Sequence, residues 1–176
     1  MWILEIKIVG DDDVLKLLYE KQIKKHMDMI ESNEYPDSGF DVYCPETWRG
    51  HQTKLVDTQI QCALWTLGSP TYNDDVTKAD KYEKKHRKPS AYYMYARSSI
   101  YKTGYRLANN VGIIDSGYRG NLKAAMDCVV KNSALEKGKR YWQLCTPTLE
   151  PFGIVRLVDN LEDTKRGSGG HGSTGN

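Results

Sequence analysis

Residues 108–121 have the sequence ANNVGIIDSGYRGN. The segment VGII has the length and the β-branched content of a short strand, and Gly, Asn and Asp on either side are typical of turns. Asp115 stands where the strand gives way to the turn, so the strand would fix its carboxylate and the turn would expose it. This position suits a catalytic carboxylate, although an Asp that caps its own turn is the more common occurrence.

The same succession of a short strand and a turn fills the second half of the chain. The turns contain Gly, Asn, Asp and Pro, which favour the chain reversals between strands. Closely spaced short strands predict an all-β domain, either a sandwich or a jelly roll. The predicted strands are AYYMYA (91–96), GYRLA (104–108), VGIID (111–115), LKAAMDCVV (122–130), RYWQLCT (140–146) and GIVRLV (153–158).

The first part of the chain adds one helix to this pattern. Residues 2–9 alternate between apolar and polar and predict a strand. Asp11–Asp13 then offer an N-cap, and the apolar residues that follow recur at helical spacing, which predicts a helix over residues 13–31. FDVYC (40–44) and KLVDTQIQCALWTL (54–67) predict two further strands.

Residues 68–90 form a polar segment with two prolines. Between residues 78 and 88 there are six Lys or Arg against two acidic residues, a local charge of 6 − 2 = +4. Such a cluster is found in localisation signals and nucleic-acid patches. The more common interpretation, a solvated loop between two strands, is the one that we favour.

Composition limits the possible functions. The 176 residues suffice for one domain with a sizeable core, and the net charge of +2 commits the chain neither to nucleic acid nor to a membrane surface. The longest apolar runs are too short to span a bilayer. The cysteines are widely spread without a CxxC pair, which predicts free thiols in a reducing, intracellular compartment; a zinc site lacks the usual ligand spacing. They are Cys44, Cys62, Cys128 and Cys145.

Two further stretches have features of phosphate-binding segments. The tail RGSGGHGSTGN (166–176) offers backbone N–H groups that no side chain obstructs, together with three hydroxyls. A disordered tail of Gly and Ser would look the same. In YARSSI (95–100), Arg97 and two serines also suit phosphate, but Arg-Ser-Ser is frequent in ordinary turns.

Taken together and in this order, the stretches resemble the five motifs of the trimeric, all-β deoxyuridine triphosphate nucleotidohydrolases (dUTPases). The third motif is the most specific of the matches, and residues 1–37 match none of them. The segment around 68–90 is longer than in compact bacterial members and is similar to that of longer viral forms. The matching stretches are SGFDVY (38–43), YARSSI (95–100), NNVGIIDSGYRGN (109–121), GKRYWQLCTP (138–147) and RGSGGHGSTG (166–175).

The resemblance implies a jelly-roll-like fold that assembles as a homotrimer with three shared active sites. It implies an N-terminal strand and helix extension (1–37), a β domain (38–165) and a flexible, glycine-rich arm (166–176) that closes over the nucleotide. The implied reaction hydrolyses dUTP to dUMP and pyrophosphate with Mg²⁺. The reaction keeps uracil out of DNA and supplies dUMP for thymidylate synthesis. Neither nucleic acid nor a membrane is implied as a partner.

The resemblance also implies a role for particular residues. Asp115 would activate the water that attacks the α-phosphorus, Asn109 would contact the uracil edge, and Tyr118 would pack under the deoxyribose and exclude a 2′-hydroxyl. Mg²⁺ would be held by the substrate phosphates and water, with no direct protein ligand; Asp41 would lie near it and near the arginine of the arm. The other implied substrate contacts are Gly112 and Ile114 in the hairpin, Arg97, Ser98, Ser99 and Gln143 at the phosphates, and Arg166, Ser168, Gly170, His171, Gly172, Ser173 and Thr174 in the arm.

Three residues depart from the family pattern. His171 stands where most members have a phenylalanine that stacks on uracil, and an imidazole can also stack, with less apolar area. Gly117 replaces a common acidic residue, and Ala96 replaces a proline, which costs loop stiffness. Three alternatives remain: a dCTP deaminase of the same superfamily, a catalytically idle relative that binds dUTP or a protein, and a basic nucleic-acid module.

Overall fold

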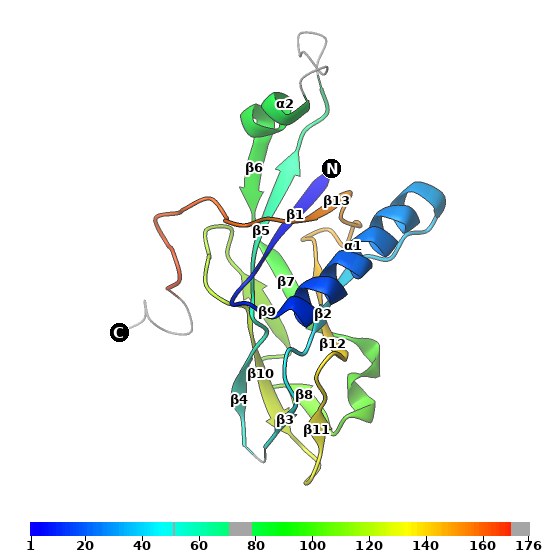
Figure 1. The fold of residues 1–176 in the computed structure, drawn as a ribbon, viewed down its shortest axis with the longest axis vertical. Coiled ribbons are helices and arrows are strands. Elements are labelled where there is room, and N and C mark those ends of the chain that lie inside the picture. Colours follow the sequence, from blue (N-terminus) through cyan, green and yellow to red (C-terminus); the bar gives the residue numbers. More distant parts are fainter. Residues whose placement is uncertain (51, 71–78, 170–176) are drawn as a thin grey trace.

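The structure, a computed structural model, describes residues 1–50, 52–70 and 79–169. Within these ranges the chain forms mainly strands, with two α-helices and one short 3-10 helix (Figure 1). The strands are β1 (Trp2–Ile8), β2 (Gly39–Tyr43), β3 (Trp48–Arg49), β4 (Lys54–Asp57), β5 (Ile60–Leu67), β6 (Arg87–Ser90), β7 (Tyr92–Ala96), β8 (Tyr105–Leu107), β9 (Val111–Ile114), β10 (Lys123–Cys128), β11 (Ala134–Leu135), β12 (Arg140–Cys145) and β13 (Ile154–Leu157). The helices are α1 (Asp13–Ser32), α2 (Ala79–His86) and η1 (Ser98–Lys102).

The strands form four sheets, which confirms the all-β class expected from the sequence. Their orders are β13-β1-β5-β6, β4-β10-β8, β11-β3 and β2-β12-β7-β9. The pair β1–β13 is parallel, and the other strand pairs are antiparallel. Strand β1 therefore lies in the interior of its sheet, between β13 and β5, so that the first and last strands of the described chain lie side by side.

The two four-stranded sheets share one hydrophobic core. Leu4 and Ile6 of β1 belong to the same buried cluster as Trp142 and Leu144 of β12. Each such fully buried side chain contributes about 1.5–3 kcal/mol through the hydrophobic effect. The strand at the N-terminus is thus part of the same packing unit as the strand that contains most of the fourth motif.

The predicted N-terminal helix is confirmed as α1. The carboxylate of Asp12 accepts the N–H of Leu15 at 2.9 Å and caps the first turn. The buried Tyr19 accepts the backbone N–H of Tyr43 at 3.2 Å, which fixes the helix against β2. Among the described residues, neither helix is both long enough and apolar enough to cross a bilayer.

The single strand predicted over residues 54–67 is wrong, because the chain turns at Thr58 and Gln59. Gln59 has a φ of +57°, a conformation that cannot continue a strand, and its N–H donates to the Asp57 carboxylate at 2.8 Å. The Thr58 hydroxyl donates to the carbonyl of Leu122 at 2.7 Å. The segment therefore becomes two strands, β4 and β5, which pair in different sheets.

The loop predicted over residues 68–90 is also wrong in its second half. Residues 79–86 form α2, and residues 87–90 form β6, which pairs with β5 as an edge strand. Pro89 is tolerated there because an edge strand does not need every N–H. Arg87, from the basic cluster, is a buried ion-pair partner, and its side chain is only 8% exposed. Residues 71–78 of that predicted loop lie outside the described residues.

All four cysteines are free thiols, as expected from their spacing. Three of them are buried: Cys44, Cys62 and Cys145. Burial raises the pKa of the Cys44 thiol to about 11, and it raises the pKa of Cys62 further. These buried thiols remain protonated at neutral pH and act as small core side chains.

Candidate functional site

The turn after β9 forms one wall of a cavity of about 180 Å³, here called the hairpin pocket. The connection between β8 and β9, which lie in different sheets, turns at Asn110, whose φ is +61°. There the N–H of Val111 donates to the carbonyl of Asn109 at 2.6 Å. Asp115 follows the end of β9, where its carbonyl accepts the N–H of Tyr118 at 3.0 Å. The pocket is lined by Asn109, Gly112, Ile113, Ile114, Asp115, Tyr118, Leu122, Lys123 and Arg166.

Tyr118 is held rigidly in the wall of the hairpin pocket. Its hydroxyl donates to the carbonyl of Asn121 at 2.9 Å. Gly120 leaves room for the ring, because a Cβ at that position would lie 2.5 Å from the Tyr118 hydroxyl oxygen and 2.7 Å from Cζ. Burial, assisted by the negative charge of Asp57, raises the pKa of Tyr118. The phenol is therefore a neutral, fixed surface at physiological pH.

Asp115 lies at the exposed side of the hairpin pocket. Its carboxylate forms an ion pair with Arg166 at 2.8 Å, and about half of the Asp115 side chain is exposed. The chain around Arg166 follows the turn, since Thr164 donates its hydroxyl to the Gly117 carbonyl and the N–H of Arg119 donates to the Gly167 carbonyl at 2.8 Å. The base of the C-terminal tail is thus in contact with the turn that carries the predicted catalytic carboxylate.

A second cavity, of about 560 Å³, lies over β2, β12 and β7 and is here called the strand pocket. In the sheet register, Gln143 of β12 stands opposite both Asp41 of β2 and Tyr95 of β7. Their side chains therefore project from one face of the sheet. The pocket is lined by Asp37, Ser38, Gly39, Asp41, Tyr95, Arg97, Ser98, Gln143, Cys145 and Leu149.

Asp41 is the electrostatic centre of the strand pocket. It forms ion pairs with Arg97 at 2.7 Å and with Arg140 at 3.0 Å, and both arginines remain partly exposed. Burial raises the pKa of Asp41, and this effect outweighs the opposing charges of the two guanidiniums. Two partly exposed guanidiniums on one carboxylate keep free N–H donors, which suit an incoming phosphate.

The Gln143 side chain is fixed by its neighbours on either strand. Its Nε2 donates to the carbonyl of Ala96 at 3.4 Å. A Cβ on Gly39 would lie 2.2 Å from the Gln143 Oε1, so only glycine at position 39 leaves that amide in place. Gly39 of the first motif therefore leaves the space that the Gln143 side chain of the fourth motif occupies.

The structure divides the predicted site residues between these two pockets, which share no lining residue. Asn109, Gly112, Ile114, Asp115, Tyr118 and Arg166 line the hairpin pocket, whereas Asp41, Arg97, Ser98 and Gln143 line the strand pocket. Ser99 lies in η1 and lines neither pocket, and Ser168 is exposed on the tail. Within this chain Arg166 pairs with Asp115. The predicted contacts Gly170, His171, Gly172, Ser173 and Thr174 lie outside the described residues.

Two arginines beside the pockets were not predicted from the sequence. Arg140 lies three positions before Gln143 inside the fourth motif, and its pairing with Asp41 follows only from the β2–β12 register, which contains an irregularity between Arg140 and Trp142. Arg119 holds the turn, since its Nη1 donates to the carbonyls of Ser116 and Tyr118 at 3.0 and 2.8 Å. The one signal in the sequence was that Arg119 lies inside the third motif and Arg140 inside the fourth.

The strand pocket has donors that fit a magnesium–phosphate ligand. The carboxylates of Asp37 and Asp41 both line it, and Mg²⁺ in nucleotide sites typically takes one or two carboxylates while phosphates and water complete its shell. Among the residues that the structure describes, no group of three or more His, Cys, Asp or Glu side chains could hold a metal ion alone. The donor set therefore fits a metal ion that arrives with its substrate.

Comparisons with known proteins show which family this chain resembles. The family model of dUTPase matches residues 85–175. The deoxyuridine 5′-triphosphate nucleotidohydrolase of Nocardia farcinica is 38% identical over 79 residues, 42% of this chain and 46% of that protein. The enzyme of the same name from Escherichia phage T5 is 38% identical over 82 residues, 45% of this chain and 54% of that protein.

The chain spans about half the length of the curated relatives that it matches. A solved dUTPase structure from Streptococcus mutans has a TM-score of 0.44 and 23% identity, and the likeness covers 74% of this chain and 86% of that one. This structural likeness adds nothing to the assignment, which depends on the family model. Because that model matches more than half of the residues, the chain belongs to the dUTPase family.

Proposed function

We propose that the protein hydrolyses dUTP to dUMP and pyrophosphate. The observation that carries this proposal is the hairpin pocket, in which Asp115, Asn109 and Tyr118 of the third motif line one cavity. Family membership supplies the substrate class, and the relatives from Nocardia farcinica and phage T5 are named for deoxyuridine triphosphate. The dUMP product would supply thymidylate synthesis. The removal of dUTP would keep uracil out of DNA inside the cell.

The hairpin pocket would bind the nucleoside. Asn109 lies in the turn before β9 and Gly112 and Ile114 lie in β9, where backbone N–H and carbonyl groups can pair with the uracil edge. A hydrogen-bonding hairpin distinguishes uracil from cytosine because their donor and acceptor are exchanged, and a close fit excludes the methyl group of thymine. The fixed ring of Tyr118 would fill the space that a 2′-hydroxyl needs.

The strand pocket would bind the triphosphate. Arg97 and Arg140 would contribute charged donors, while Ser98 and Gln143 would contribute neutral ones. We assign Ser99, Arg166 and Ser168 to the same task, together with Gly170, His171, Gly172, Ser173 and Thr174 of the tail. Mg²⁺, when bound with the substrate, would neutralise phosphate charge. Asp41 would orient both arginines beside it.

Asp115 would act as the general base. A water oxygen attacks the α-phosphorus, its proton passes to the Asp115 carboxylate, and the bond to the β-phosphate oxygen breaks so that pyrophosphate leaves. Arg166 forms an ion pair with this carboxylate at 2.8 Å. The triphosphate offers Arg166 a more highly charged partner, so that binding would release the base for the water.

A complete site would need more than one copy of the chain. The hairpin and strand pockets have no residue in common, yet a nucleotide needs both a base site and a phosphate site. We therefore propose a homotrimer in which copies contribute different pockets to each site. Mixing Asp115→Asn chains with Arg97→Gln chains tests this arrangement, because shared sites regain activity after subunit exchange. No regain after verified exchange would place each site within one copy.

The first test is pyrophosphate release from dUTP, dCTP, dTTP and UTP with Mg²⁺. Release from dUTP alone is expected, and Asp115→Asn should lower kcat by about 10²–10⁴-fold while dUTP binding persists. Asp159→Asn, an exposed carboxylate outside both pockets, is the matched control. Normal turnover by Asp115→Asn would refute the assigned base. Binding without turnover by the unmodified chain would identify a catalytically idle relative.

A further inference from the structure

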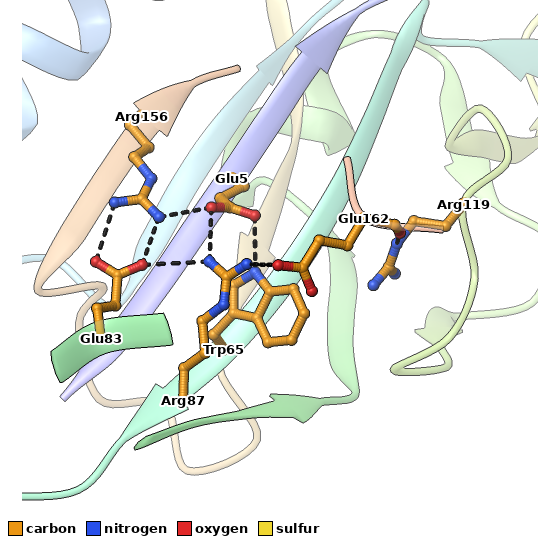
Figure 2. Close-up of polar contacts among 7 residues, drawn as sticks. All are labelled: Glu5, Trp65, Glu83, Arg87, Arg119, Arg156 and Glu162. Carbon is orange, nitrogen blue, oxygen red and sulfur yellow. Dashed lines mark hydrogen bonds and ion pairs between the residues drawn. The ribbon is translucent and has the colours of Figure 1, made fainter. Parts of the chain in front are cut away.

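A second group of carboxylates and guanidiniums lies away from both pockets and is here called the Glu5 cluster. It consists of Glu5, Trp65, Glu83, Arg87 and Arg156, which come from β1, β5, α2, β6 and β13 (Figure 2). The side chains of Glu5 and Arg87 are each only 8% exposed. No step of the proposed reaction uses this cluster.

Every carboxylate oxygen of Glu5 has a partner. One oxygen accepts Arg156 at 2.6 Å and Arg87 at 3.0 Å, and the other accepts the Trp65 indole N–H at 2.8 Å. Glu83 accepts Arg156 at 2.5 and 3.1 Å and Arg87 at 3.2 Å. Two glutamates therefore balance two arginines, and this balance is the condition under which buried charges are tolerated.

One guanidinium nitrogen of Arg87, Nη2, binds a residue outside the Glu5 cluster. Its Nη1 donates to Glu5 and Glu83, and its guanidinium stacks on the Trp65 ring at 4.0 Å from the centroid. Its Nη2 donates to Glu162, which reaches it from the tail (Figure 2). A guanidinium can make these contacts at once because its donors form a planar fork, whereas a lysine ammonium cannot.

Glu162 begins the tail base, defined here as residues 162–167. The Arg119 Nε donates to the Glu162 carbonyl at 2.9 Å, and the same side chain holds the turn that follows Asp115. Four residues later Arg166 reaches Asp115. In Figure 1 the tail leaves β13 and crosses to the side of the molecule opposite α1. The tail base thus has one contact with the Glu5 cluster and several with the turn.

We propose that Arg87 is a positioning residue that tethers the tail base, through Glu162, across the turn of the hairpin pocket. The residue comes from the polar segment at 68–90, so this segment would govern where the tail starts its path toward the nucleotide. The catalytic part of the inference depends on the proposed function, but the tether itself does not. Arg87 acts through Glu162 and touches neither pocket.

Limited trypsin cleavage after Lys165 and Arg166 tests the tether without any nucleotide. Glu162→Gln removes only the outer contact, because Glu162 is about half exposed and the Glu5 cluster keeps its other partners. Cleavage in the tail should become about two- to fivefold faster, the factor expected for an ion pair of this exposure, while Tm changes little. Asp163→Asn, a neighbouring exposed carboxylate, is the matched control and should leave the rate unchanged.

A double mutant decides whether Arg87 acts through Glu162. In an Arg87→Lys background, Glu162→Gln should not accelerate cleavage further, because the contact is already lost. Equal acceleration in both backgrounds would overturn the proposal, and so would an unchanged rate for Glu162→Gln alone.

Kinetics then separate the tether from the proposed function. Glu162→Gln should raise KM for dUTP by the same two- to fivefold and leave kcat nearly unchanged, because fewer tails occupy the competent position before binding. An effect on kcat alone would contradict a positioning role. If the unmodified chain releases no pyrophosphate, the proposed function fails, while the cleavage experiment still decides the tether.

Discussion

Glu5 and Asp41 each bind two arginines, and their surroundings differ. Glu5 lies between Arg87 and Arg156 in the interior, and Asp41 lies between Arg97 and Arg140 at the edge of the strand pocket. Around Glu5, a tryptophan and a second glutamate complete the hydrogen bonds. Around Asp41, no second carboxylate balances the arginines among the ion pairs of the described residues.

The two carboxylates differ in the direction of their pKa. Burial would raise the pKa of Glu5, but hydrogen bonds from Arg156 and Trp65 and the charges of both arginines outweigh it and lower that pKa. At Asp41 burial prevails and the pKa is raised. The same residue types therefore make a buried structural network in one place and a partly exposed site in the other. Guanidinium donors that stay exposed beside a cavity are available to a ligand.

The largest expected effect is on the Glu5 side of this comparison. Glu5→Gln removes a carboxylate from the buried Arg87 and from the partly exposed Arg156. Glu83 and the outer Glu162 do not replace that buried partner, so the free energy of unfolding should fall by about 3 kcal/mol. For a chain of this size that corresponds to a decrease in Tm of about 6–12 °C, measured by calorimetry. Glu150→Gln is the control, because Glu150 also accepts a tryptophan N–H, from Trp2, but is exposed. Equal losses in the two variants would remove the distinction between buried and exposed carboxylates.

The next effect concerns the strand pocket. Arg97→Gln should lower kcat/KM for dUTP roughly 10- to 100-fold, since a charge-assisted hydrogen bond contributes about 1.5–3 kcal/mol. Tm should change little because Arg97 is partly exposed. Arg106→Gln, which disrupts the exposed pair with Asp127, serves as the control in steady-state kinetics. A large loss of stability with normal kinetics would show that the ion pairs of Asp41 with Arg97 and Arg140 have a structural role and do not serve substrate binding.

A smaller effect is expected from crowding the same pocket. Gly39→Ala forces the Gln143 amide aside, because the new Cβ would lie 2.2 Å from Oε1. KM for dUTP should rise about tenfold through the loss of one hydrogen bond to a charged phosphate. At Gly68 a Cβ meets nothing within 4 Å, so Gly68→Ala should leave KM unchanged. If KM is unchanged in both variants, Gln143 does not contact the substrate.

The smallest expected effect is on the pH dependence of stability, which has opposite signs for Glu5 and Asp41. Because the pKa of Glu5 is lowered on folding, its contribution to stability is present above its ordinary pKa of 4.5 and is lost as pH falls through the folded value. The stability gap between the unmodified chain and Glu5→Gln should therefore narrow in acid.

For Asp41 the raised pKa reverses the trend. Its contribution is present below the ordinary value of 3.8 and is lost as pH rises through the raised pKa of the folded state, so Asp41→Asn should gain stability relative to the unmodified chain as pH rises through that range. Urea unfolding at several pH values measures both trends. Parallel trends in the two variants would refute the assigned directions.

Local sequence determined a large part of this protein. Alternation, capping residues and turn residues predicted β1, α1, β2 and the short strands after residue 91, because these patterns depend on neighbours along the chain. The predictions failed at Thr58–Gln59, where a turn is set by Asp57 and by the distant Leu122, and at residues 79–90. In that segment β6 forms only because it pairs with the edge of β5.

The motifs likewise named most of the pocket residues, because each motif is local. What the sequence could not determine is how those residues divide between two pockets, or that Arg140 joins Asp41 and Arg166 joins Asp115. Nor could it indicate that Glu5, Arg87, Arg156 and Glu162 meet, since they lie up to 157 positions apart, from residue 5 to residue 162. Such contacts depend on strand register and on burial, which are decided only when distant strands pair in the tertiary structure.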